Sequence, residues 1–267
     1  MLRTPAVAGQ FYPGSPSQLA SMIQSFIDSQ VTPQPAILAI CPHAGYVYSG
    51  ATAAKVLGRI AIPRRVVVAG PNHRGAGHPV AVMSKGAWET PLGQVDLDAE
   101  LGAELLAQSD LVAEDETAHR MEHSLEVQVP ILQYFRSDFL LTPLCLSHLD
   151  LASCLELGKA LARAVTAVAE PVLMVSSTDM THYEPAEQAK AKDDQALKHV
   201  LDLDPEGLYN TVRSQRISMC GVLPTAVCLA AAKQLGAASA QLVEYTNSGA
   251  VSGDYQQVVG YAGLIVN

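Results

Sequence analysis

The sequence lacks the short motifs that identify several large enzyme and binding classes. It has no GxSxG nucleophile elbow, no Walker phosphate loop and no CxxC pair of the kind that marks a zinc site. Gly75-Ala76-Gly77 is not followed by a third glycine three residues later, so the dinucleotide-binding fingerprint is missing as well. These absences exclude the serine hydrolases, P-loop nucleotide hydrolases, zinc fingers and nicotinamide-dependent dehydrogenases that carry such motifs.

Basic residues and long apolar runs are also scarce. The chain has 17 Lys and Arg against 26 Asp and Glu, and a net charge of −9. Nucleic acids and anionic membranes require a basic surface, so we expect neither as a partner. No stretch approaches the ~18 uncharged apolar residues of a membrane helix, and residues 1–13 do not resemble a signal peptide. Five cysteines without regular spacing do not form a disulfide framework. We therefore expect a cytoplasmic protein with reduced thiols.

The overall composition predicts a single folded domain over residues 1–267. Hydrophobic residues make up 49% of the chain and charged residues 16%, which is too apolar for disorder. Hydrophobic strands alternate with segments of helical periodicity, a pattern typical of an α/β fold with a mainly parallel central sheet and helices on both faces. We expect strands ending at Cys41 and at 65–69, 80–84, 139–146, 172–176, 241–245 and 257–266. Helices are expected at 17–29, 49–60, 98–108, 124–135, 151–168, 186–201, 205–213 and 222–235.

The placement of histidines points to a functional site. Among eight histidines, His43 and His73 each stand just past a hydrophobic strand, and His182 follows a third strand by a polar stretch that contains Asp179. In an open α/β sheet, ligands bind beyond the carboxyl ends of the strands. A single histidine in such a loop more often caps a backbone carbonyl, but the repeated position favours one shared site. Imidazoles and a carboxylate at one edge are typical of a metal centre or of acid–base catalysis.

Cys220 and the segment from His119 to His123 can each be interpreted in two ways. Cys220 lies between polar residues and Gly221 at the start of a predicted helix, where a helix amino terminus and a metal could stabilise its thiolate; it could equally be a small core residue. The segment from His119 to His123 spells HxxEH, the inverted zinc-peptidase motif with Glu122 as general base. That motif requires one helix across all five residues, whereas the better helix begins afterwards with Ser124 as its N-cap.

Seven sequence motifs follow one another along nearly the whole chain. They are Arg3-Thr4-Pro5-Ala6-Val7-Ala8-Gly9 with Phe11-Tyr12-Pro13, Pro42-His43-Ala44-Gly45-Tyr46 followed by Tyr48-Ser49-Gly50, Gly70-Pro71-Asn72-His73, Thr90-Pro91-Leu92-Gly93, Glu122-His123-Ser124-Leu125-Glu126, Ser177-Thr178-Asp179-Met180-Thr181-His182-Tyr183 and Cys220-Gly221. With these motifs the chain resembles the Memo family, whose bacterial members are called AmmeMemoRadiSam system protein B.

The resemblance implies a fold related to the class III extradiol dioxygenases, which hold non-haem iron(II) with two histidines and a glutamate. By position, His43 and His73 match the two histidine ligands, and Cys220 stands in place of the glutamate. Asp179 and His182 match polar and acid–base groups beside the metal. A thiolate favours iron, copper or zinc over magnesium or calcium, and it puts ordinary ring cleavage in doubt.

The sequence thus predicts a metal-binding protein with a redox or dioxygenase-like activity. Its ligands are His43, His73 and Cys220, and iron is the expected metal, with copper or zinc as alternatives. Asp179 and His182 would be the catalytic pair, and the residues expected to line the substrate pocket are Tyr46, His123 and Tyr183. The alternatives are a zinc hydrolase using the same cleft or HxxEH, and a non-enzymatic module that binds a peptide or protein. We expect the metal cleft to bind a small molecule or a peptide. The resemblance also implies a functional link to a radical-SAM protein.

Overall fold

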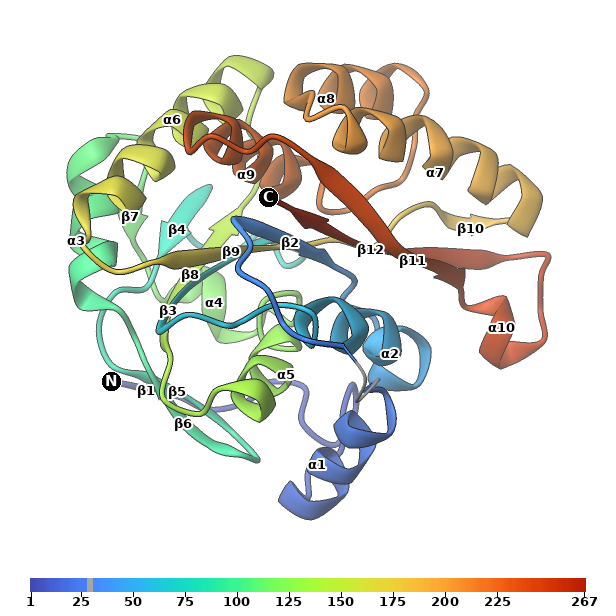
Figure 1. The fold of residues 1–267 in the computed structure, drawn as a ribbon, viewed down its shortest axis with the longest axis horizontal. Helices are drawn as coiled ribbons and strands as arrows, with labels where there is room; N and C mark the ends of the chain where they lie inside the picture. Colours follow the sequence, from blue (N-terminus) through green and yellow to red (C-terminus); the bar gives the residue numbers. More distant parts are fainter. Residues whose placement is uncertain (28–30) are drawn as a thin grey trace.

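A nine-stranded sheet runs through the centre of the molecule (Figure 1). In the computed structural model, which describes residues 1–27 and 31–267, its strands follow the order β10-β12-β2-β9-β3-β8-β4-β7, and β11 pairs with β12. The strands are β2 (Leu38–Cys41), β3 (Arg65–Pro71), β4 (Val80–Val82), β7 (Ala113–Glu114), β8 (Leu140–Leu146), β9 (Val172–Ser177), β10 (His182–Glu184), β11 (Ala240–Asn247) and β12 (Val258–Val266). The predicted α/β architecture is confirmed.

The middle of this sheet is parallel and its margins are mixed. Strands β2, β9, β3 and β8 pair in parallel, whereas β12 pairs antiparallel with β2, β10 and β11, and β4 pairs antiparallel with β8. Because β2, β9 and β3 are direct neighbours that run in one direction, their carboxyl ends meet at one edge. The loops after them are therefore brought together by topology alone.

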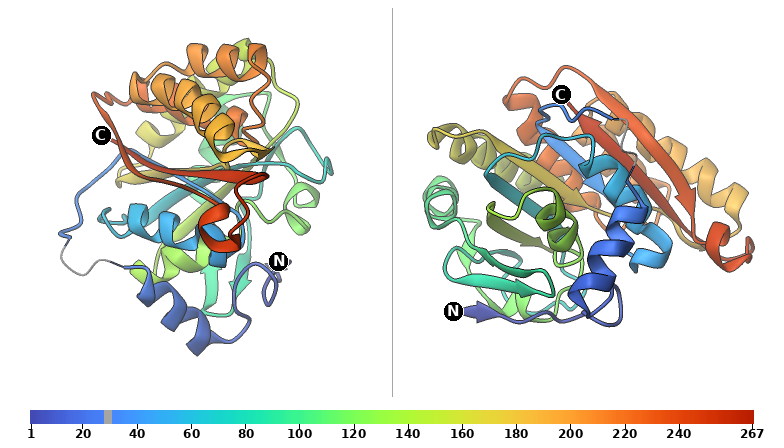
Figure 2. Two further views of the ribbon diagram at one scale, coloured as in Figure 1. Left: turned by 90° about the vertical axis from the view of Figure 1, so that its right-hand side faces the viewer. Right: turned by 60° about the horizontal axis from the view of Figure 1, so that its bottom comes forward.

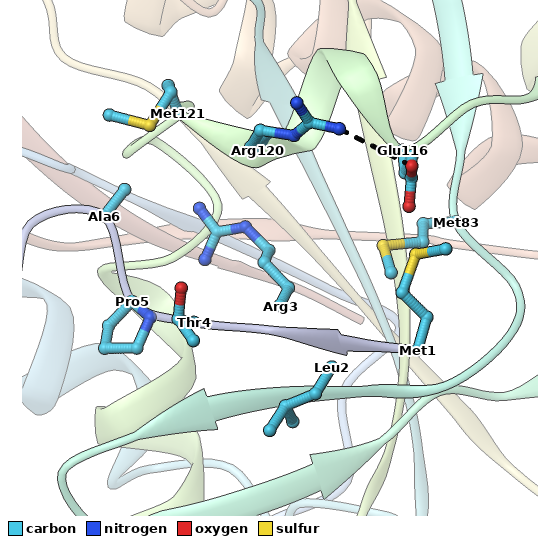
Figure 3. A pocket seen from close by; sticks show the side chains of 10 residues that line it. All are labelled: Met1, Leu2, Arg3, Thr4, Pro5, Ala6, Met83, Glu116, Arg120 and Met121. Carbon is cyan, nitrogen blue, oxygen red and sulfur yellow. Dashed lines mark ion pairs between the residues drawn. The ribbon is translucent and has the colours of Figure 1, made fainter.

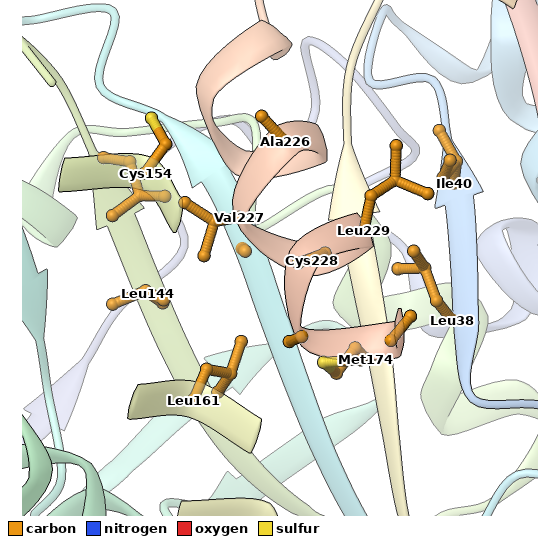
Figure 4. Packing of buried hydrophobic residues seen from close by; sticks show 14 of the residues in the cluster. Leu38, Ile40, Leu144, Cys154, Leu161, Met174, Ala226, Val227, Cys228 and Leu229 are labelled. Carbon is orange, nitrogen blue, oxygen red and sulfur yellow. The ribbon is translucent and has the colours of Figure 1, made fainter. Parts of the chain in front are cut away.

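Helices cover both faces of the sheet, as Figure 2 shows. One layer contains α3 (Ala99–Gln108), α6 (Leu151–Ala167), α7 (Ala186–Leu201), α8 (Pro205–Ser214) and α9 (Val222–Gln234); the other contains α1 (Pro16–Ser25), α2 (Tyr46–Leu57) and α5 (Gln128–Phe135). Alternate residues of each central strand face opposite layers. Leu38 and Ile40 of β2 pack under α9 (Figure 4), while Ala39 and Cys41 belong to the other core. Burial on both faces explains why these strands are continuous hydrophobic runs.

Several predicted boundaries were wrong in ways that matter for the site. The helix expected from Ser124 begins at Gln128, because the Ser124 hydroxyl donates to the Pro71 carbonyl instead of capping a helix. The helix expected from Ser49 begins at Tyr46, whose backbone N–H donates to the Phe11 carbonyl. The expected end of the first helix, at Ser29, lies outside the described residues.

Short elements were not predicted. They are β7 and β10 of the central sheet, the one-turn helices α4 (Thr117–Arg120) and α10 (Gly249–Ser252), and the strands β1 (Leu2–Arg3), β5 (Ala87–Thr90) and β6 (Gly93–Asp96), which form a separate three-stranded sheet. Such segments are too short to show a hydrophobic period. Within the described residues, no helix combines the length and the apolar character that crossing a membrane requires.

Candidate metal centre

The loops that follow β2, β3 and β9 carry polar side chains to one edge of the sheet. His43, His73 and Asp179 each stand two residues beyond the last residue of their strand. His43 and Asp179 are buried, whereas the side chain of His73 is 31% exposed. The ring centroids of His43 and His73 lie 5.2 Å apart with the rings nearly perpendicular. The structure thus brings together the two histidines that the sequence pairs.

Hydrogen bonds determine which nitrogen of His43 faces the site. The Ser177 hydroxyl donates to the Ser124 carbonyl at 2.6 Å, so its oxygen accepts from His43 Nδ1 at 2.9 Å. Gln128 Nε2 donates to the same oxygen at 2.9 Å. The Nδ1 of His43 is therefore protonated and its Nε2 carries a lone pair. Burial, together with the nearby His73, holds the pKa of His43 well below its usual value, so the ring is neutral.

Glu122 orients His73 in the same manner. Its Oε1 accepts from His73 Nδ1 at 2.8 Å and its Oε2 accepts from the His73 backbone N–H at 2.6 Å. Ser124 also donates its backbone N–H to Oε1 at 2.8 Å. Burial raises the pKa of Glu122, but the hydrogen bonds from His73 and Ser124 outweigh it and bring that pKa to about 2. An ionised carboxylate only accepts, so His73 Nδ1 carries a proton and Nε2 is the nitrogen that remains for a ligand. A carboxylate behind a histidine is the usual support of a metal ligand.

His123 is the third member of the cluster. Its ring stacks on His73 with centroids 4.6 Å apart, and its centroid lies 5.6 Å from that of His43. One ligand atom from each of these three histidines lies within 4.8 Å of the others. Burial lowers the pKa of His123 to about 4. We expected His123 as a pocket residue, and as a ligand only in the HxxEH alternative; the structure makes it a candidate ligand beside His43 and His73.

Cys220 lies directly beside this cluster. Its Sγ is 3.2 Å from His43 Nε2 and accepts the backbone N–H of Asp179 at 3.2 Å. We expected the amino terminus of the following helix to favour a thiolate. The expectation was wrong for the protein without a bound cation, since burial and the Asp179 carboxylate raise the pKa of the Cys220 thiol above its usual range. The protonated thiol then faces the lone pair on His43 Nε2.

The proposed acid–base residues lie on the strand β9 side of the cluster. Asp179 Oδ1 accepts the backbone N–H of His43 at 2.7 Å. Burial raises the pKa of Asp179 to about 6, although backbone N–H groups of His43 and Ala44 oppose that effect. His182 is anchored by its backbone N–H, which donates to the Ser218 hydroxyl at 2.8 Å. Its Nδ1 is buried and has no hydrogen-bond partner in the part of the chain that the structure describes.

The two tyrosines expected at the pocket differ in their surroundings. Tyr183 is 74% exposed, its φ is +58°, and its ring centroid lies 5.8 Å from that of His182. Tyr46 is buried in the core, its ring centroid lies 5.4 Å from that of Tyr12, and its hydroxyl donates to the Val127 carbonyl at 2.6 Å. Tyr46 therefore has no free polar group to offer a substrate, because its hydroxyl proton is already committed.

The HxxEH segment does not form a zinc-peptidase helix, so that interpretation is wrong. Helix α4 ends at Arg120, before the glutamate of the motif. His119 is buried against Trp88, with ring centroids 5.8 Å apart, and within the described residues neither of its ring nitrogens has a partner. Burial lowers the pKa of His119 to about 3. The two histidines of the motif thus lie in different environments, and Glu122 is engaged by His73.

Sequence reasoning missed the supporting residues. Ser177 and Gln128 orient His43, and Glu122 orients His73. For Glu122 and Ser177 the available signal was their place in the sequence motifs, with Glu122 beside His123 and Ser177 two residues before Asp179; Gln128 lies outside those motifs. Strand and helix periodicity does not show that one side chain will support another across a fold.

Comparisons with known proteins identify the family of the chain. The family model described as "Memo-like protein" matches residues 3–265. A MEMO1 family protein of Methanopyrus kandleri is 42% identical over 279 aligned residues, which cover 99% of each chain. A second from Methanosarcina barkeri is 45% identical, covering 99% of this chain and all of the relative. A third from Aquifex aeolicus is 43% identical, with 99% and 98% covered.

Among solved structures, an uncharacterized protein from Escherichia coli K12 has a TM-score of 0.53 with 14% identity, and the match covers 85% of this chain and 99% of that one. At that identity the likeness shows a shared fold alone. The three relatives carry more information, because their alignments span nearly the whole of both chains at 42–45% identity. The chain belongs to the Memo family.

Proposed function

We propose that this protein holds a divalent transition-metal ion with His43 and His73 and acts in redox chemistry. The observation that carries the proposal is the orientation of the two rings. Each Nδ1 is occupied by an oxygen partner, which leaves each Nε2 to face the cluster. With His123, ligand atoms of three imidazoles gather within 4.8 Å of one another. Nitrogen donors gathered in this way favour a cation among them.

Cys220 is our proposal for the third ligand. Donors of a tetrahedral site with the metal–nitrogen and metal–sulfur lengths usual for zinc lie about 3.5 Å apart, close to the 3.2 Å between Cys220 Sγ and His43 Nε2. Its thiol would lose a proton on binding, which makes affinity rise with pH. A thiolate with imidazoles favours iron, copper or zinc, and iron is our proposal by the resemblance to dioxygenases.

Asp179 and His182 are the residues that we propose to move protons. A bound ion would supply a redox-active or Lewis-acidic centre with open positions for a small substrate. A carboxyl group with a pKa near 6 can be found in either protonation state at neutral pH, as acid–base work requires. The role of His182 comes from the resemblance, which has an acid–base histidine at this position; its Nδ1 is buried and has no partner among the described residues. Tyr183 would border the substrate at the exposed side.

A second candidate is a zinc-dependent hydrolase in the same cleft. The observation that favours it is the group of three histidines, because three histidines and one open position form a common catalytic zinc site. His123 would then be the third ligand. Glu122 is committed to His73, so Asp179 or His182 would serve as the base. The expected peptide or protein ligand and the link to a radical-SAM protein remain predictions.

Metal analysis of anaerobically purified protein tests the proposal. We expect a near-stoichiometric transition metal in the wild type and in His78→Ala, a histidine outside the cluster, and a large loss in His43→Ala and His73→Ala. Iron with substrate-dependent oxygen uptake supports the redox function, whereas zinc with hydrolysis of ester or amide substrates supports the second candidate. Full metal content in both His43→Ala and His73→Ala would contradict the redox function and the zinc-hydrolase function alike.

A further inference from the structure

The amino-terminal segment, residues 3–12, is the motif that the proposed function leaves unused. It passes along the irregular chain from His119 to Val127, which we term the 119–127 loop and which carries Glu122 and His123. Only one helical turn, α4, extends into this loop. Its shape therefore depends on contacts from elsewhere in the chain.

Arg3 makes the most extensive of these contacts. Its Nε donates to the His119 carbonyl at 2.7 Å and its Nη2 donates to the Glu122 carbonyl at 2.8 Å. Its Nη1 forms an ion pair with Glu126 at 2.8 Å, and the guanidinium lies 4.1 Å from the centre of the Trp88 ring. The Arg3 side chain is only 4% exposed. The planar fork of a guanidinium binds separate acceptors in fixed directions, which a lysine cannot reproduce.

Glu126 ties the rest of the segment to the end of the same loop. Its two carboxylate oxygens accept the backbone N–H groups of Ala6 at 2.8 Å and Val7 at 3.0 Å, and the Tyr12 hydroxyl at 2.6 Å. This carboxylate is fully buried, so every one of these partners offsets its loss of water. Both ends of the 119–127 loop are thereby fastened to residues more than a hundred positions away in the sequence.

Phe11 brings the segment into contact with the histidines themselves. Its ring centroid is 4.7 Å from that of His123, and its carbonyl accepts the backbone N–H of Tyr46 at the start of α2. On its outer side the segment borders an open pocket of about 580 Å³, lined by Met83, Arg120 and Met121 among others (Figure 3). Arg3 reaches from the strand toward the turn that carries Arg120. Since the outer side is open, the pairing of β1 with β5 and the inner contacts determine where the segment lies.

From these contacts we infer that Arg3 is a positioning residue for the metal centre. By holding the carbonyls of His119 and Glu122, it sets the turn from which the Glu122 carboxylate reaches His73 and from which His123 stacks on that ring. This inference rests on the proposed metal function. It adds that the amino-terminal motif controls metal affinity without touching the ion.

Arg3→Gln tests the inference, with Arg65→Gln as the matched control. Arg65 is likewise buried and ion-paired, to Asp98 at 2.7 Å, but it lies at the opposite end of β3 from His73. Co²⁺ titration followed by visible absorption reports both affinity and ligand geometry. We expect Arg3→Gln to weaken Co²⁺ binding about tenfold and to change the spectrum, as loss of groups behind a metal ligand does elsewhere. Arg65→Gln should stay within about twofold of the wild type, even if it is equally destabilised. Arg3→Lys should behave like Arg3→Gln, because it keeps the charge and loses the fork.

A second measurement separates this inference from the proposed function. Nitrogen chemical shifts of the imidazoles in metal-free protein report the tautomer of His73, and we expect Arg3→Gln to mix the tautomers while Arg65→Gln does not. If the wild type fails to bind Co²⁺ but this difference is seen, the metal proposal falls and the positioning role stands. If Arg3→Gln and Arg65→Gln are alike in affinity, spectrum and tautomer, the positioning role is overturned.

Discussion

Glu122 holds His73 by two hydrogen bonds, one from the ring Nδ1 at 2.8 Å and one from the backbone N–H at 2.6 Å. The pair fixes the position of the ring, its rotation and its tautomer at once. A histidine held in this way loses little freedom when it binds a cation, so the carboxylate contributes to affinity without being a ligand. The carboxylate of Glu122 thus holds a partly exposed loop histidine in the orientation in which it can bind a cation.

Glu122→Gln should therefore weaken metal binding while leaving the fold intact. The amide keeps the size of the side chain but loses its charge and can turn an N–H toward His73. We expect metal affinity to fall about ten- to a hundredfold, the range usual for such supporting groups. Isothermal titration with Zn²⁺ measures it, and Glu116→Gln, an exposed position just before α4, is the control. An unchanged affinity in Glu122→Gln would remove the supporting role.

The choice between Cys220 and His123 as third ligand can be decided with cobalt. Thiolate-bound Co²⁺ absorbs strongly in the near ultraviolet, and imidazole-bound Co²⁺ does not. We expect this absorption in the wild type and its loss in Cys220→Ser, with His123→Ala retaining it at weaker affinity. The reverse pattern, in which Cys220→Ser is unaffected and His123→Ala fails to bind, would assign the site to the three histidines.

The reactivity of Cys220 should depend on metal and on pH. With metal bound, we expect protection from iodoacetamide, because the sulfur is committed as a ligand. Without metal, burial and Asp179 raise the pKa of the thiol, so labelling should be slow near neutral pH and accelerate above the range of an ordinary cysteine. The buried Cys145, Cys154 and Cys228 should stay slow in both states. Peptide mapping with and without chelator measures this at alkaline pH, where the metal-free thiol reacts, and equal labelling of Cys220 in both states at that pH would argue against a metal thiolate.

His119 should make the protein sensitive to acid. Its pKa is lowered by burial to about 3 in the fold, against a usual 6.5, so the unfolded chain takes up a proton first as the pH falls. The stability contributed by the neutral ring is thus complete above pH 6.5 and is lost between there and about 3. At pH 4.5 the loss amounts to about 3 kcal/mol.

Replacing His119 with leucine should remove its contribution to the loss of stability at acidic pH. Urea unfolding at pH 7.5 and 4.5 should show a smaller loss of stability in His119→Leu than in the wild type. His78→Leu, at an exposed histidine, should lose as much as the wild type. If His119→Leu is as acid-sensitive as the wild type, the buried neutral ring is not the cause.

The sequence alone was sufficient for the elements that determine the location of the site. The hydrophobic runs before His43 and His73 predict buried strands, and two histidines in equivalent positions past such strands predict a shared edge. Both inferences rely on local periodicity and on one rule of sheet topology. For this reason the sequence places His43 and His73 at one edge of the sheet, where the structure has their ring centroids 5.2 Å apart.

Tertiary structure decided the rest. The HxxEH motif requires a helix across residues 119–123, and the sequence favoured a helix that begins later; in the fold, the position of the 119–127 loop is set by hydrogen bonds to Arg3 and His73. His119 and His123, four residues apart, end in different environments, and the thiol of Cys220 is governed by burial and Asp179 rather than by the helix that follows it. Periodicity is a property of neighbouring residues, whereas burial and hydrogen bonding across more than a hundred positions exist only once the chain has folded.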